Sequence, residues 1–150
     1  MKSGTDQTRK AAQIVEVRAL QQFAAQAKLH KASRVLKELQ GDRALQVGRQ
    51  DERLKAWSSS LAGAILRLDL MAAWASAITE GQDDLDRTDR DIVEAQSEFS
   101  RLKTSWQKSV AQTDAADGMQ QLIARKAKRQ EEELTSSNSA DLVSQIWAAR

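Results

Sequence analysis

A seven-residue repeat of large apolar side chains is the feature that most constrains the fold of this chain. An interval of seven residues is two turns of an α-helix, and a sustained repeat of this kind is typical of a coiled-coil seam. Its members are Met71, Ile78, Leu85, Ile92, Phe99 and Trp106. Apolar residues in steps of seven, three and four precede it, at Val47, Leu54, Trp57 and Leu61. The sequence therefore predicts two helical arms that pack against each other.

Composition agrees with a chain that is almost entirely helical. The 150 residues contain no proline, six glycines and no tyrosine, and 29% of them are charged. Proline is the strongest helix breaker, and charged residues interspersed with alanine and leucine are typical of solvated helix faces. The predicted fold is all-α: a long antiparallel two-helix coiled-coil hairpin with a short C-terminal segment, forming one domain over residues 1–150.

Several classes of function are disfavoured by the residues that are missing. The chain has no cysteine and one histidine, so sulfur-based metal sites, disulfides and histidine-centred catalysis have no donors. A two-helix hairpin also offers no pocket for a small-molecule substrate. We expect a protein that is not an enzyme, with no cofactor and no metal. The N-terminus lacks an apolar stretch, and the most apolar window is interrupted by charges, so we expect no membrane insertion and a cytoplasmic location.

The turn of the hairpin is expected where the apolar spacing fails. Between Leu61 and Ile78 the apolar residues no longer follow one helix face, Gly63 interrupts the pattern, and Asp69 is a candidate helix cap. We predict a first helix at about 6–61, a turn at about 62–67, a second helix at about 68–135 and a tail at 136–150. The polar run TSSNS at 135–139 is expected to break the second helix.

A second position for the turn is compatible with the residues alone. The segment TEGQDD at 79–84 contains Gly81, a plausible helix end, followed by two candidate cap residues. A fold at about Ala64 places Trp57 opposite Met71, whereas a fold at 79–84 places Trp57 opposite Trp106. Both registers align two apolar rows, so the two turns remain open at this point.

The first arm is predicted to bury one apolar side and to carry a register slip. The expected buried residues are Ile14, Val17, Leu20 and Ala24, followed by Leu29, Ala32, Leu36 and Leu39. Between Leu39 and Val47 the heptad slips by one residue, which predicts local unwinding or a gentle bend.

Opposite charges are expected to fix the register of the two arms. Residues 28–37 contain Lys28, Lys31, Arg34 and Lys37, whereas residues 80–94 carry seven acidic and two basic side chains. Exposed pairs of this kind add little stability but can set orientation. The basic face also suggests a helical arm for nucleic acid, although it lacks the aromatic residues that stack on bases. A net charge of +2 does not favour nucleic-acid binding by itself.

Two stretches resemble a known family. The run of Leu61, Ala62, Gly63, Ile65, Leu68, Leu70 and Trp74, followed by Ile78 and Leu85, is similar to the segment after the hairpin turn in type III secretion stalk proteins of the YscO/FliJ family. The ending, with Trp106 followed by RKAKRQEEEL, resembles the same proteins. This resemblance favours the turn at 62–67.

The resemblance implies a stalk and adaptor without an active site of its own. Such a protein stands in the hexameric secretion ATPase, couples it to the export gate and handles substrate chaperones, in the cytoplasm at the inner membrane. The positions that match the family's gate contacts are Trp74 and Ile78. We further expect Arg125, Lys126 and Arg129 to contact the ATPase ring, because the end of the second arm is predicted to extend past the first.

The expected molecule is a monomer. The alternative function is a generic coiled-coil scaffold that binds itself or a partner helix without contacting an ATPase, and the nucleic-acid arm is a further alternative. The sequence does not distinguish a flagellar from a virulence system.

Overall fold

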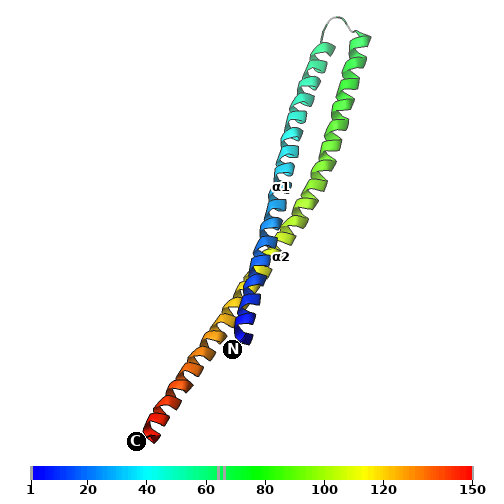
Figure 1. Ribbon diagram of the computed structural model, residues 1–150. Coiled ribbons are helices and arrows are strands. Elements are labelled where there is room, and N and C mark those ends of the chain that lie inside the picture. The colour runs from blue at the N-terminus through cyan, green and yellow to red at the C-terminus, as the bar shows by residue number, and fades with distance from the viewer. Residues whose placement is uncertain (1, 64, 66, 150) are drawn as a thin grey trace. The chain divides into compact units, whose positions relative to one another are not determined.

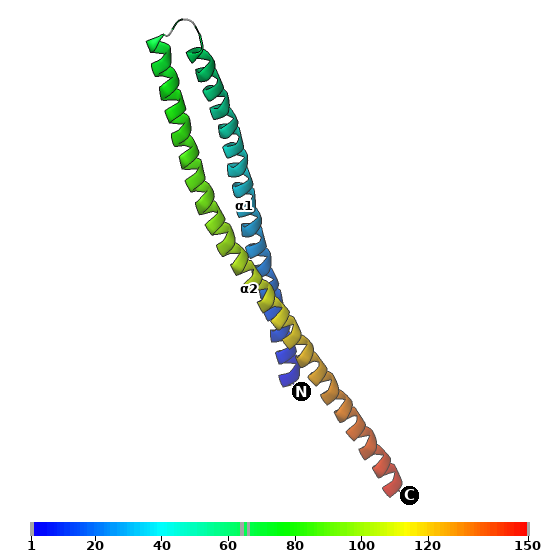
Figure 2. The ribbon, with the colours of Figure 1, turned by 180° about the vertical axis from the view of Figure 1, so that it is seen from behind.

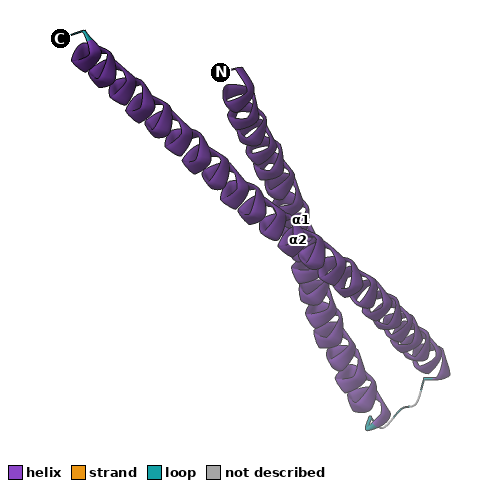
Figure 3. Ribbon diagram, turned by 90° about the horizontal axis from the view of Figure 1, so that it is seen from below, coloured by secondary structure: helices purple, strands orange, loops and turns teal. Residues whose placement is uncertain are grey.

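The structure is a computed structural model that describes residues 2–63, 65 and 67–149. It contains two helices, α1 (Lys2–Leu61) and α2 (Leu68–Ala148), and no strand within the described residues (Figure 3). The predicted all-α fold of two long helices that pack against each other is confirmed. The first helix begins at Lys2 rather than at about residue 6.

The two helices join at residues 62–67. Because α1 ends at Leu61 and α2 begins at Leu68, the alternative turn at 79–84 lies inside α2. Positions 64 and 66 lie outside the described residues. The amide of Met71 donates to the carbonyl of Arg67 at 3.0 Å, which closes the first turn of α2. Asp69 therefore lies within this first turn, where a carboxylate is favourable to the helix dipole, and accepts a bond from Arg67 at 2.8 Å.

Contacts divide the chain into two compact units, whereas the sequence was interpreted as one domain. The central unit is Gln26–Thr104, and the terminal unit is Met1–Ala25 with Ser105–Arg150. Each unit contains one segment of α1 and one segment of α2. They are described one at a time.

In the central unit the two helix segments run antiparallel, side by side (Figures 1 and 2). Arg53 donates to the carbonyl of Ala77 at 3.2 Å, and Gln50 donates to the carbonyl of Ile78 at 2.7 Å. Arg43 pairs with Asp89 farther along. Partner numbers rise as the α1 numbers fall, and the pairs agree, within one helical turn, with a fold that places Trp57 opposite Met71.

The seam of α2 in this unit consists of two rows. One row is the predicted repeat, in which Leu85 and Ile92 are each 9% exposed. Each member of the second row lies three residues after a member of the first. This row includes small and polar residues, so a search for large apolar residues did not detect it. Its members in this unit are Trp74, Gly81, Thr88, Ala95 and Leu102, all buried or half-buried.

The predicted register slip in α1 is wrong. Past Leu39, steps of three and four lead to Arg43, Gln46, Gln50, Arg53 and Trp57, and all of these except Arg43 are buried or half-buried. Arg43 is exposed and pairs with Asp89 across the seam. The seam residues are polar in this segment, so the only large apolar residues that could indicate the register were Val47 and Leu54. Their positions gave the impression of a one-residue slip.

The predicted buried side of α1 in the terminal unit is also wrong. Ile14, Val17 and Leu20 are 55%, 52% and 64% exposed, and Ala24 is exposed as well. The seam is instead formed by a row of smaller or polar residues: Ala11, Val15, Arg18, Gln22 and Ala25. Ala11, at 7% exposure, is its most buried member. This row, and not the neighbouring stripe of larger apolar residues, faces α2.

The expected helix break at 135–139 is absent, because α2 continues through it to Ala148. Two hydroxyl groups of this stretch bond back to carbonyls of their own helix, as serine and threonine do when they lie in helices. Thr135 donates to the Glu131 carbonyl at 2.7 Å, and Ser139 donates to the Ser136 carbonyl at 2.8 Å. The predicted tail at 136–150 is therefore helical over its described residues up to 148.

The expected charge pairing between the arms is mostly absent. Within the described residues, Lys28, Lys31, Arg34 and Lys37 form no ion pair. The acidic run instead lies along a more polar part of α1, and the pair that joins the two helices there is Arg43 with Asp89. In the observed register, residues 28–37 of α1 do not lie opposite most of the acidic residues of α2.

Candidate partner-binding surfaces

The described residues present helix surfaces rather than an enclosed catalytic site. Among them there is no group of three or more His, Asp or Glu side chains placed to hold a metal ion. In the part of the chain that the structure describes, no helix is long and apolar enough to cross a membrane. The surfaces that remain to be considered are the start of α2, the basic cluster and the exposed apolar faces.

Trp74 and Ile78 lie in the seam of the central unit, near the start of α2. Both are half-buried, one in each row of the seam. Ala75, the residue after Trp74, is exposed. The two side chains are one helical turn apart and project toward the same side of α2. A half-buried tryptophan retains an accessible surface, so both a packing role and a binding role are compatible with this placement.

Next to this pair, a glycine of α2 accommodates polar side chains of α1. A Cβ atom added at Gly81 would lie 2.1 Å from Oε1 of Gln50 and 2.6 Å from Nη1 of Arg53. Gln50 is 7% exposed, and its Oε1 is buried with no hydrogen-bond partner among the described residues. The missing side chain of Gly81 therefore makes room for Gln50, and this polar contact fixes the register locally.

The basic cluster consists of Arg125, Lys126 and Arg129, all exposed on α2. None of the three forms an ion pair within the described residues, and the neighbouring ion pair joins Lys128 to Glu132 at 3.9 Å. The cluster is thus free to meet an external carboxylate, as the prediction of a partner contact requires. Arginine and lysine donors of this kind form charge-assisted bonds.

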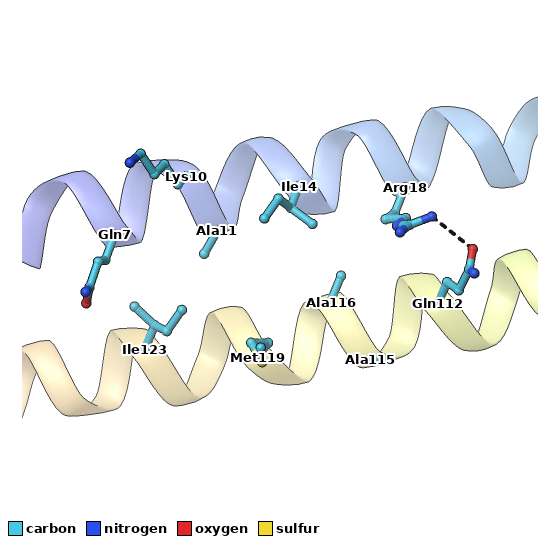
Figure 4. A pocket seen from close by; sticks show the side chains of 10 residues that line it. All are labelled: Gln7, Lys10, Ala11, Ile14, Arg18, Gln112, Ala115, Ala116, Met119 and Ile123. Atoms are coloured by element: carbon cyan, nitrogen blue, oxygen red, sulfur yellow. Dashed lines mark hydrogen bonds between the residues drawn. The ribbon is translucent and has the colours of Figure 1, made fainter.

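A groove of about 450 Å³ lies between α1 and α2 in the terminal unit (Figure 4). The floor of the groove is lined by the small side chains of Ala11, Ala115 and Ala116. The exposed side chains of Ile14 and Met119 form its walls. At one end Arg18 donates to Oε1 of Gln112 at 3.0 Å, and at the other end lie Gln7 and Lys10. The groove is an apolar surface between two helices, with basic groups at its ends.

Farther along α2, a group of large apolar side chains is exposed. Both views show no α1 segment beside this orange-to-red part of α2 (Figures 1 and 2). Its exposed members are Leu134, Leu142, Val143, Ile146 and Trp147. The last four recur at helical spacing and form an amphipathic stripe. Exposed apolar stripes rimmed by polar residues are typical of protein-binding surfaces.

One exposed ion pair on the central unit perturbs a carboxyl group. Glu98 and Arg101 are one turn apart, and Arg101 donates to both carboxylate oxygens, at 2.8 and 2.6 Å. These hydrogen bonds lower the pKa of Glu98 and raise the pKa of Arg101. Both residues belong to α2, so the pair acts within one helix.

Sequence reasoning identified the exposed basic cluster and the pair Trp74 and Ile78 as candidate contacts, and it missed the groove and the polar seam. The groove residues gave a weak signal, since Ile14 and Met119 are ordinary apolar helix residues and their pairing depends on register. Gly81 was interpreted as a helix end, but its spacing of seven from Trp74 and Thr88 could have placed it in the seam.

Comparisons with known proteins gave no relative for this chain. A scan against protein-family models, a search of curated proteins and a search of solved structures each found no match. The chemistry of the surfaces therefore carries the functional interpretation.

Proposed function

We propose that this protein is a non-enzymatic helical adaptor, and specifically a stalk of a type III secretion or flagellar export system. In this role it inserts in the hexameric export ATPase, couples it to the export gate and handles substrate chaperones. It works in the cytoplasm, peripheral to the secretion apparatus at the inner membrane. The resemblance at Leu61–Leu85 and at RKAKRQEEEL supports this role, as does the antiparallel helix pair.

The observation that carries the proposal is the unpaired basic cluster. Arg125, Lys126 and Arg129 are exposed and form no ion pair within the described residues. They lie on α2 next to the stretch that has no α1 segment beside it (Figure 2). A cluster in this position has access to the carboxylates of a surrounding ring. The contact would be sensitive to salt, because exposed charges are screened.

The test is reconstitution with the export ATPase of the same cell. The triple variant Arg125→Glu, Lys126→Glu and Arg129→Glu is expected to lose binding and stimulation of ATP hydrolysis. A matched control reverses three exposed, unpaired basic residues of the central unit, Lys28, Lys31 and Arg34. Unchanged stimulation by the first variant, or equal loss in the control, would contradict the proposed contact.

The second candidate function is a coiled-coil scaffold that binds a partner helix without an ATPase. The exposed stripe at Leu142, Val143, Ile146 and Trp147 favours it, because a helix face of this kind is stabilised by packing. Co-purification from cell extract separates the two functions. Recovery of a hexameric ATPase supports the stalk, and its absence from material that retains another helical partner supports the scaffold.

A further inference from the structure

Charge on the distal part of α2 is divided into two adjacent blocks. Residues 125–129 carry four basic side chains and no acidic one, whereas residues 130–149 carry four acidic side chains and no Lys or Arg. Three of the acids are consecutive, Glu131–Glu133. All these side chains are exposed. Within one helix, Lys128 and Arg129 lie three or four residues from these glutamates, and Lys128 pairs with Glu132 at 3.9 Å. Arg125 and Lys126 lie too far along the helix to reach them.

A second copy of the same helix, laid antiparallel, does bring the blocks together. With the crossing point near Arg129, Arg125 of one copy lies opposite Glu133 of the other, and Lys126 lies opposite Glu132. Two-fold symmetry repeats both contacts. A surface that complements itself in this way is the requirement for an isologous dimer. Antiparallel coiled coils use flanking charges for the same choice of orientation.

The same alignment places the exposed apolar stripe on the groove of the terminal unit. Leu142 and Val143 of one copy lie opposite Ala116 and Ala115 of the other. The large side chains of Leu142 and Val143 thereby contact the small alanine side chains that line the groove (Figure 4). Ile14 and Met119, which are 55% and 64% exposed, flank the entering helix and lose solvent contact. The groove, with a volume of about 450 Å³, is open to receive Leu142 and Val143.

We propose that residues 130–148 of α2 dock into the groove of a second copy, forming an antiparallel dimer with one such contact at each end. Each docked segment turns the local helix pair into a three-helix arrangement and covers its apolar stripe. This inference goes beyond the proposed function. Both the dimer and an ATPase ring would use Arg125, Lys126 and Arg129, so the dimer is a form of the free protein that excludes ring binding.

The first test measures the mass of the purified chain in solution. Light scattering and sedimentation over a range of concentrations are expected to give twice the chain mass of 16.7 kDa. The dimer should dissociate as salt rises from about 0.1 M to about 1 M, because its charged blocks become screened. A monomer at every concentration at low salt would overturn the proposal.

Apolar variants locate the interface. The double variant Leu142→Asp and Val143→Asp is expected to be monomeric with unchanged helicity, since both side chains are exposed in the single chain. The matched control is Leu20→Asp with Phe23→Asp, which changes two residues of the same unit that are 64% and 72% exposed and lie outside the groove. A dimeric first variant, or a monomeric control, would refute the docking.

Charge reversal tests the orientation, and the test contains its own rescue. Reversing Glu131–Glu133 to lysine should give a monomer, and reversing Arg125, Lys126 and Arg129 to glutamate should do the same. Mixing the two variants should restore a dimer, because each then complements the other. Failure of the mixture to associate would refute the antiparallel alignment. This assay uses the purified chain alone, so it fails or succeeds independently of ATPase binding.

A disulfide provides direct evidence of proximity. The native chain has no cysteine, so Ser139→Cys in one copy and Met119→Cys in another form a unique pair. The alignment places these positions opposite each other and predicts rapid formation of the mixed disulfide under mild oxidation. Equal yields with Ser76→Cys, an exposed residue of the central unit, in place of Ser139→Cys would show random collision and contradict the geometry.

Discussion

Replacing Gln50 by methionine is expected to stabilise the protein. Gln50 lies in the α1 seam at 7% exposure, and its Oε1 has no hydrogen-bond partner. An unpartnered buried polar atom costs about 1–3 kcal/mol. Methionine has nearly the same length and shape and is unbranched, so it fits the space that Gly81 leaves open.

The substitution also removes one favourable interaction, which decides the size of the gain. The bond from Nε2 of Gln50 to the Ile78 carbonyl is 2.7 Å long, and a neutral hydrogen bond of this kind contributes about 1 kcal/mol. The Ile78 carbonyl lies inside α2, where an amide four residues on remains available. The net stabilisation is therefore expected to be about 1 kcal/mol.

Urea unfolding followed by circular dichroism measures this gain. A stabilisation of about 1 kcal/mol raises the midpoint by about 0.5 M at a slope of about 2 kcal/mol per molar, and raises Tm by about 2–4 °C. The control is Gln40→Met on the exposed side of α1. If Gln50→Met lowers the midpoint while Gln40→Met does not, the amide stabilises the seam and the reasoning about Oε1 is wrong.

Replacing a helical glycine by alanine usually stabilises a protein by about 1 kcal/mol. Gly81→Ala should lose most of this stabilisation, because the new Cβ displaces Gln50. Gly48→Ala, whose Cβ meets nothing within 4 Å, should show the full stabilisation in the same urea assay. Arg101→Gln should raise the pKa of the Glu98 carboxyl, measured by NMR titration. Because the folded pKa of Glu98 is lowered, the stability from this pair is present above the unfolded pKa near 4.3 and is lost as pH falls through the folded value. An unchanged Glu98 titration in Arg101→Gln would contradict the assignment. Trp74→Ala should lower stability by less than the roughly 3–5 kcal/mol of a fully buried tryptophan, and greater loss would place Trp74 wholly in the core.

The candidate binding surfaces were predictable from the sequence only where exposure was enough to define them. The basic cluster at Arg125, Lys126 and Arg129 could be located because a charged helix end stays exposed in almost any packing. The groove could not, since its walls at Ile14 and Met119 come from opposite ends of the chain. Ile14 was predicted to be buried, and it is instead the wall of an open surface.

The sequence by itself determined that the chain forms two long helices, and it narrowed their junction to two positions, 62–67 and 79–84, of which the family resemblance favoured the first. Absence of proline, the seven-residue repeat and the failure of apolar spacing after Leu61 are local properties, and helix ends depend on such local chemistry. Even so, the polar run at 135–139 misled, because its hydroxyl groups bond within the helix as readily as they end one.

Only the tertiary structure decided which face of α1 is buried in the terminal unit and beyond Leu39, whereas Leu29, Ala32, Leu36 and Leu39 are half-buried on the side that the sequence predicted. A helix with apolar residues on more than one side can present any of them, and the choice depends on what the other helix offers opposite. Gly81 offers space, so Gln50 and Arg53 fill the seam although both are polar. Packing is a property of pairs of residues distant in sequence, and the row with the most apolar residues is not always the row that fits.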